Sequence, residues 1–186
     1  MIRTVILGGV LLGLALPAVA HAGDDPTSTD RANAAQECRH ERGSTAATRE
    51  AFAAKYRTFG KCVSTRARDE ASERHAARSN AAKTCKAERG TTAESRRAFE
   101  QKYGTNGNKA NAYGKCVSQA ADQADDKADA ADRHAADARI TAAKQCADER
   151  GTTAASRKAF ADKYATNGHK SNAFGRCVSK QARVGN

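Results

Sequence analysis

The stretch Ala81–Ser118, AAKTCKAERGTTAESRRAFEQKYGTNGNKANAYGKCVS, decides the fold because the chain writes its pattern three times. The other two copies are Ala34–Ser64 and Ala142–Ser179, and each copy has two cysteines, one Glu-Arg-Gly triplet and three aromatic residues. All 6 cysteines, all 5 phenylalanines and all 4 tyrosines of the chain fall inside these copies. Such periodicity is typical of an array of repeated small units.

The first 22 residues have the features of a secretion signal. Arg3 precedes an apolar run from Val5 to Ala20, and Ala20-His21-Ala22 fits the small-x-small cleavage pattern. We therefore expect residues 1–22 to be removed on export, which leaves a secreted or cell-envelope protein. A retained membrane anchor is the alternative, but the run is short for a membrane span. Residues 23–31 are predicted to be a disordered N-terminal segment.

The composition after the signal excludes one large hydrophobic core. Every leucine and the only methionine lie in the signal, and the chain has no tryptophan. Burial of the few remaining large apolar side chains cannot offset roughly 1–2 kcal/mol of backbone entropy per residue over a domain of this length. Several small cores with additional stabilisation are therefore expected.

Each copy is predicted to form three helical segments. The first ends at the Glu-Arg-Gly triplet, whose glycine supplies a left-handed C-terminal cap. In the middle copy, Thr91 and Glu94 have capping-box spacing, and Phe99 and Tyr103 share one helical face. The third segment follows an Asn-Gly turn, except in the first copy, which lacks seven residues equivalent to 106–112. A glycine two residues before the second cysteine is predicted to allow close backbone approach, since it lowers helix stability otherwise.

The cysteines are predicted to pair within each copy. If the chain between Cys62 and Cys85 is helical, those two lie about 35 Å apart, whereas a disulfide needs Cα atoms within about 7 Å. Pairing inside the copies remains, with each bond closing a loop that contributes roughly 3–4 kcal/mol. The predicted bonds are Cys38–Cys62, Cys85–Cys116 and Cys146–Cys177.

Metal binding is the other interpretation of these cysteines. Cys38 and His40 have the look of a ligand pair, but the middle copy has no histidine and no copy has a Cys-x-x-Cys motif. Two cysteines per repeat in an exported chain are more often disulfide-bonded. No metal site and no cofactor is therefore predicted.

Two alanine-rich connectors separate the predicted modules, which span residues 32–64, 80–118 and 141–182. Connectors 65–79 and 119–140 are predicted to be helical, with disorder as the alternative. Alanines at 121, 128, 135 and 142, and at 124, 131 and 138, form a heptad stripe. This stripe is either a packed seam against another helix or one face of a solvated single helix. The solvated helix is favoured because alanine buries little area.

Positive charge recurs in the modules, within a chain whose formal net charge is +11. One interpretation is binding of an anionic polymer, such as a cell-wall polymer, a lipid surface or nucleic acid. The other is solubility together with internal ion pairs such as Glu88–Arg96. The candidate anion-binding residues are Arg49, Lys55, Lys61, Arg96, Lys102, Lys115, Arg157, Lys163 and Arg176.

Catalysis is not supported by what the copies share. No histidine or aspartate recurs within the modules, and the recurrent pair His75 and His134 lies in the connectors. A nucleophile, a positioned base and an orienting group cannot be assembled from the shared residues. We therefore predict that the protein is not an enzyme.

The middle copy resembles a repeat of secreted actinobacterial-type proteins. The residues that carry the resemblance are Cys85, Glu88, Arg89, Gly90, Phe99, Lys102, Tyr103, Gly114, Lys115, Cys116 and Val117. The resemblance covers all three modules and implies export and a repeat unit, but no activity. We predict an elongated all-α protein of three small disulfide-stapled helical modules joined by long Ala-rich helices. Its expected role is binding an anionic polymer, and a structural spacer is the alternative.

Overall fold

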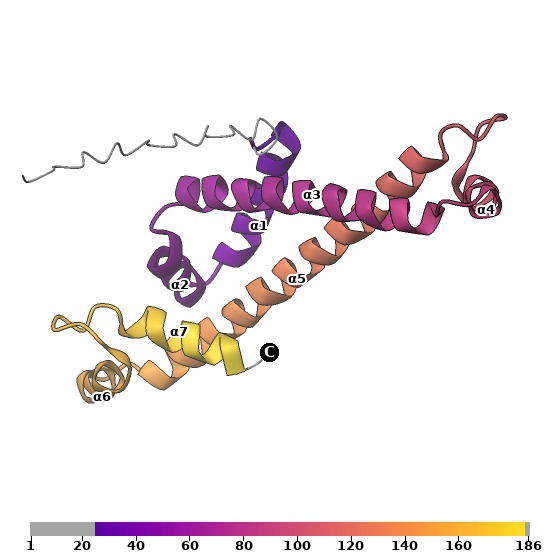
Figure 1. The fold of residues 1–186 in the computed structure, drawn as a ribbon. Helices are drawn as coiled ribbons and strands as arrows, with labels where there is room; N and C mark the ends of the chain where they lie inside the picture. Colours follow the sequence, from indigo (N-terminus) through magenta and orange to yellow (C-terminus); the bar gives the residue numbers. More distant parts are fainter. Residues whose placement is uncertain (1–24, 185–186) are drawn as a thin grey trace, which may run out of the picture.

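The computed structural model describes residues 25–184, which form seven α-helices and no strand (Figure 1). The predicted all-α class is confirmed. The predicted signal, residues 1–22, lies outside the described residues. The helices are α1 (Ser28–Arg42), α2 (Ala46–Tyr56), α3 (Phe59–Arg89), α4 (Ala93–Tyr103), α5 (Ala112–Arg150), α6 (Ala154–Tyr164) and α7 (Ala173–Val184).

Part of the predicted N-terminal segment 23–31 is helical, so the predicted disorder is wrong for residues 28–31. Helix α1 begins at Ser28, so the last four residues of the segment 23–31 are helical. Thr27 and Asp30 form a reciprocal capping box, and the Asp30 carboxylate also accepts a hydrogen bond from Arg74 Nη2 at 2.9 Å. The cap and the ion pair together satisfy the first turn, which explains the earlier start.

Threonine caps begin the second helix of every module. Thr45, Thr92 and Thr153 each accept a hydrogen bond from the backbone N–H three residues later. The cap of α4 is thus Thr92, so the capping box predicted from Thr91 and Glu94 is wrong by one residue. The first helices end at Gly43, Gly90 and Gly151, whose φ angles of 58°, 63° and 63° favour glycine.

Two long helices are shared between neighbouring modules. Helix α3 has 31 residues and carries both Cys62 and Cys85, so its beginning belongs to module 1 and its end to module 2. Helix α5 has 39 residues and joins module 2 to module 3 in the same way. The predicted connectors 65–79 and 119–140 lie wholly within these two helices. No loop separates one module from the next.

Each module is stapled by the disulfide predicted for it. The bonds Cys38–Cys62, Cys85–Cys116 and Cys146–Cys177 have Cα–Cα distances of 6.0–6.1 Å. Aromatic residues pack beside them, and the Phe99 and Tyr103 ring centroids lie 4.8 Å apart. These small clusters supply little apolar area, so the disulfides contribute much of the stability of each module.

The alanine stripe of α5 is fully buried only near its ends, and Ala128 and Ala138 are partly buried. Ala121 is buried against Ala77 and Ala81 of α3, and Ala142 is buried in module 3. Ala124 and Ala131, together with Ala135, are exposed. The favoured solvated helix therefore describes the middle of the stripe, and it is wrong at Ala121 and Ala142.

Modules 1 and 3 lie side by side, while module 2 lies at the other end of the molecule (Figure 1). Ala51 of α2 belongs to the buried cluster of module 3. A Cβ on Gly175 would lie 3.0 Å from the Ala54 Cβ, and Arg150 Nη1 lies 2.6 Å from Glu50 Oε1. Close backbone approach was predicted at the glycine two residues before each second cysteine. It is wrong at Gly60 and Gly114, where a Cβ would meet nothing within 4 Å, and at Gly175 the approaching atom is a side chain of another module.

Candidate anion-binding groove

Each module holds a glutamate–lysine–tyrosine group between its first and second helices. In module 2, Glu88 Oε1 accepts a hydrogen bond from Lys102 Nζ at 2.6 Å, and Glu88 Oε2 accepts one from the Tyr103 hydroxyl at 2.9 Å. The predicted Glu88–Arg96 ion pair is therefore wrong, because Arg96 donates instead to the Thr91 carbonyl at 2.7 Å. The corresponding groups are Glu41 with Lys55 and Tyr56, and Glu149 with Lys163 and Tyr164.

Three of the predicted anion-binding residues are thus already paired with a carboxylate of their own module. Hydrogen bonds from Lys102 and Tyr103 lower the pKa of the Glu88 carboxyl, and that from Lys163 lowers the pKa of Glu149. The glutamates therefore stay ionised and offset the charge of Lys55, Lys102 and Lys163. The predicted row of cationic residues, one per module, is therefore wrong at these three lysines, because each is paired with a glutamate.

Glu41 differs from its counterparts because it is buried. Its carboxylate accepts hydrogen bonds from four side chains: Lys55 at 3.0 Å, Tyr56 at 3.1 Å, Arg66 at 3.1 Å and Arg139 at 2.9 Å. Burial raises the pKa of Glu41, but the ion pairs with Lys55 and Arg66 outweigh it and leave the pKa lowered. Arg139 comes from α5, so this network ties module 1 to the helix that leads into module 3.

A groove of about 390 Å³ lies where modules 1 and 3 meet. Cationic side chains reach it from three helices, namely Lys55 of α2, Arg139 of α5 and Arg176 of α7. Neutral hydrogen-bonding groups complete its lining. The full set is Ala54, Lys55, Arg139, Ser171, Asn172, Gly175, Arg176 and Ser179.

A second groove of about 490 Å³ continues along α7. It shares Arg176 and Ser179 with the first, so we describe the two as halves of one α7 groove. Among residues 25–184, the side chains of Arg176, Lys180 and Arg183 make no ion pair and no hydrogen bond. The second half is lined by Lys163, Tyr164, Thr166, Arg176, Ser179, Lys180, Arg183 and Val184.

The α7 groove is suited to holding anions. Six cationic side chains line it, and the acidic partners of three of them are Glu41 and Glu149. Arginine offers paired N–H donors that match phosphate and carboxylate oxygens, and the serine, threonine and asparagine side chains add neutral donors. The arrangement can bind successive anionic groups, and it contains no nucleophile beside a general base.

The remaining predicted cations lie elsewhere. Arg49 donates to the Ser44 carbonyl at 3.0 Å, as Arg96 does to Thr91, so both support the start of their own helix. Lys61, Lys115 and Arg157 are exposed and do not line the α7 groove. Sequence reasoning missed Arg139, Lys180 and Arg183. The spacing of Arg176, Lys180 and Arg183, four and then three residues apart, places them on one helical face and could have revealed the last two.

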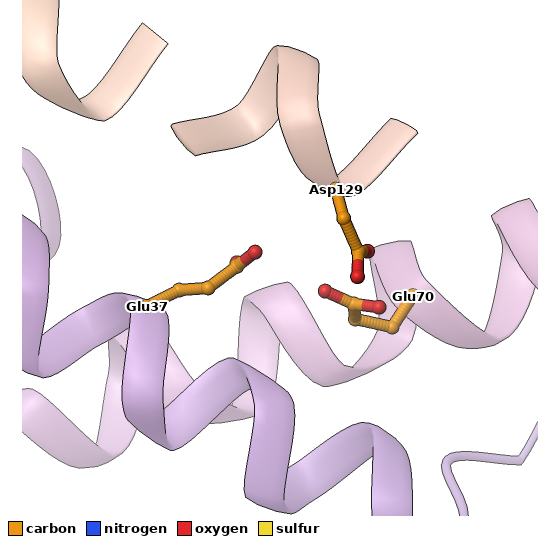
Figure 2. A group of neighbouring side chains, drawn as sticks. All are labelled: Glu37, Glu70 and Asp129. Carbon is orange, nitrogen blue, oxygen red and sulfur yellow. The ribbon is translucent and has the colours of Figure 1, made fainter. Parts of the chain in front are cut away.

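A cluster of carboxylates occupies the crossing of α1, α3 and α5. Glu37, Glu70 and Asp129 point toward one another, with oxygen atoms within 4.8 Å of each other (Figure 2). Burial, followed by repulsion from Glu37 and Asp129, raises the pKa of Glu70 to about 7. Such oxygens are ligands that Ca²⁺ accepts, although Arg66 already pairs with Glu37 at 2.8 Å. This group contains no cysteine and no histidine, so the spacing of those residues in the sequence does not predict it.

No family model matches this chain, and neither the curated proteins nor the solved structures contain a match. Within residues 25–184, no helix combines the length and the apolar character that crossing a membrane requires. The three disulfides are consistent with an extracellular protein.

Proposed function

We propose that this protein is an exported, non-enzymatic binding protein whose α7 groove holds an anionic polymer of the cell envelope or the extracellular surroundings. The observation that carries the proposal is the run of Arg176, Lys180 and Arg183 along one groove, with none of them paired to a carboxylate of the described chain. Charge of one sign gathered in a groove attracts ligands of the opposite sign more strongly than scattered surface charge does, and of these three cations Lys180 is also attracted by Glu149.

The geometry favours a polymer over a single small anion. Arg176 and Arg183 are seven residues apart on α7, which corresponds to about 10 Å along the helix axis. Lys55 and Arg139 extend the charged lining into the half between modules 1 and 3. A ligand that repeats a phosphate or carboxylate every few ångströms can contact several of these cations at once.

A structural spacer is the second candidate, and one observation supports it. Helices α3 and α5 continue without a break through two modules each, so the spacing of module 2 from modules 1 and 3 is fixed by helix length. A spacer needs this rigidity and no ligand. The two candidates therefore differ in whether the α7 groove matters.

The test measures binding of the chain beginning at Gly23, with disulfides intact, to soluble cell-wall extract, acidic lipid vesicles and DNA at low salt. Arg176, Lys180 and Arg183 are replaced together by glutamate. A matched control reverses three exposed cations of module 2, namely Lys86, Arg97 and Lys115.

The groove variant is expected to lose about tenfold or more in affinity for one of the three polymers, while the control loses much less, and native binding should weaken with salt. Equal losses of affinity in the two variants would show that binding is a diffuse electrostatic attraction and would refute the α7 groove as the binding site. Absence of native binding to all three at low salt would refute the binding function and favour the spacer.

A further inference from the structure

Module 3 shows how the outer face of a module can be covered. Its groove between α5 and α7 receives α2, with Ala51 in the shared cluster and Ala54 against Gly175. Under this helix, and with Arg150 lying 4.5 Å from the centroid of its ring, Phe174 is only 5% exposed, and Val178 is fully buried. The contact is therefore a small-residue helix seated over a glycine, an aromatic ring and a valine.

Module 1 has the same groove without an occupant from residues 25–184. Phe59 and Gly60 lie shortly before Cys62, and Val63 directly follows it. Phe174, Gly175 and Val178 have the same spacing around Cys177. Phe59 and Val63 are only partly buried, and nothing lies within 4 Å of a Cβ built on Gly60. This module 1 groove has a volume of about 530 Å³, and its lining includes Arg31, Ala35, Phe59, Gly60, Val63 and Arg68.

The occupant of the module 3 groove indicates what chemistry fits. Helix α2 presents Ala47, Ala51 and Ala54 to module 3, and its Glu50 pairs with Arg150. The module 1 groove keeps the glycine and the apolar side chains, and its exposed Arg31 and Arg68 favour an acidic ligand. An alanine-faced helix with acidic side chains satisfies both requirements.

The exposed second helices of another copy of this chain do not satisfy them. At the position of Glu50, α4 has Arg97 and α6 has Lys158, and both residues are cationic. At the position of Ala54, α4 has Gln101 and α6 has Asp162, so neither presents the small side chain that meets the glycine. Charge and shape therefore argue against the second helices of another copy as the occupant.

We propose that the module 1 groove docks a short alanine-faced helix, flanked by acidic side chains, from a partner protein. The contact repeats in trans what α2 and module 3 make within the chain. The backbone of Gly60 lets the partner helix approach Phe59 and Val63, while Arg31 and Arg68 pair with its carboxylates. This surface is separate from the α7 groove, so the inference does not depend on anion binding.

The test uses a labelled peptide based on residues 44–58. Arg49, Lys55 and Arg57 are replaced by glutamate and Phe52 and Tyr56 by alanine, which keeps Ala47, Glu50, Ala51 and Ala54. Fluorescence anisotropy measures its binding to the disulfide-bonded chain beginning at Gly23. Two variants are compared: Gly60→Leu, which fills the groove, and Gly114→Leu, which adds the same side chain at the equivalent open position of module 2.

We expect saturable binding of one peptide per chain, lowered about tenfold or more by Gly60→Leu and unchanged by Gly114→Leu. Arg31→Glu with Arg68→Glu should weaken binding without filling the groove, and circular dichroism checks that each variant folds. Failure of the native chain to bind the peptide at millimolar concentration would overturn the proposal, as would equal binding by Gly60→Leu. A native chain that dimerises, and that Gly60→Leu makes monomeric, would assign the groove to a second copy and also overturn it.

Discussion

Replacing Glu70 by glutamine should make the protein more stable at pH 8 and less sensitive to pH. Glu70 lies at the crossing of α1, α3 and α5, where burial and neighbouring carboxylates raise its pKa from 4.5 to about 7. The folded state therefore keeps a proton that the unfolded state loses between these two pH values. The contribution of Glu70 to the free energy of unfolding is therefore complete below about pH 4.5. It declines as the pH rises toward 7 and stays lowered above that pH.

The size of the effect follows from the shift in pKa. A difference of about 2.5 units corresponds to about 3.4 kcal/mol, and partial exposure of Glu70 to solvent reduces this to about 1–2 kcal/mol. The charged groups that face Glu70 divide between the helices. They are Glu37 of α1, Asp129 and Asp132 of α5, and Glu73 of α3, and Arg66 pairs with two of them, Glu37 and Asp132.

Thermal unfolding at pH 5 and pH 8, with the disulfides intact, measures this effect. Glu70→Gln should raise the melting temperature by about 3–6 °C at pH 8 and change it little at pH 5. Glu100→Gln, an exposed substitution on α4, is the matched control and should have little effect at either pH. If Glu70→Gln shifts the melting temperature equally at both pH values, charge repulsion at the crossing is not the cause.

Three further predictions concern stability. Replacing Cys146 and Cys177 together by alanine should cost about 3–4 kcal/mol and unfold module 3 first, seen as loss of hydrogen-exchange protection in α6 and α7 while module 2 keeps its protection. Glu41→Gln should lower the free energy of unfolding in urea by about 3–5 kcal/mol at pH 7, because it leaves buried cations without a carboxylate. The difference between the native chain and this variant should shrink as the pH falls through the lowered pKa of Glu41, and an unchanged difference at pH 3 would contradict the prediction. Gly60→Ala should raise the free energy of unfolding by about 0.5–1 kcal/mol. Gly175→Ala should raise it less, because the new Cβ lies 3.0 Å from the Ala54 Cβ, and equal effects would mean that α2 shifts at no cost to accommodate the methyl group.

The sequence predicts the modules well because their pattern is local and repeated. Cysteine spacing and the capping glycines lie within about forty residues, and distance along a helix is enough to exclude a Cys62–Cys85 bond. The start of α1 was missed since Asp30 is held partly by Arg74, which is 44 residues away in sequence. A local rule cannot include such a partner.

The candidate site was harder to predict because it depends on contacts between modules. Lys55 and Lys163 line the α7 groove as predicted residues, yet each pairs with a glutamate 14 residues earlier, a spacing that no single helix suggests. The docking of α2 on module 3 depends on Glu50 and Ala54, the positions where α2 departs from the other copies. Averaging the repeats hides the residues that distinguish one module from another.

The continuity of α5 restricts which insertions and deletions the chain can accept. Each residue added to its middle would move module 3 by about 1.5 Å and turn it by about 100° relative to module 2. The Glu50–Arg150 ion pair and the Ala54–Gly175 contact tolerate neither change. The exposed positions in the middle of α5, such as Ala124 and Ala131, can therefore vary in sequence, but the length of the helix is constrained by a contact between the first and last modules.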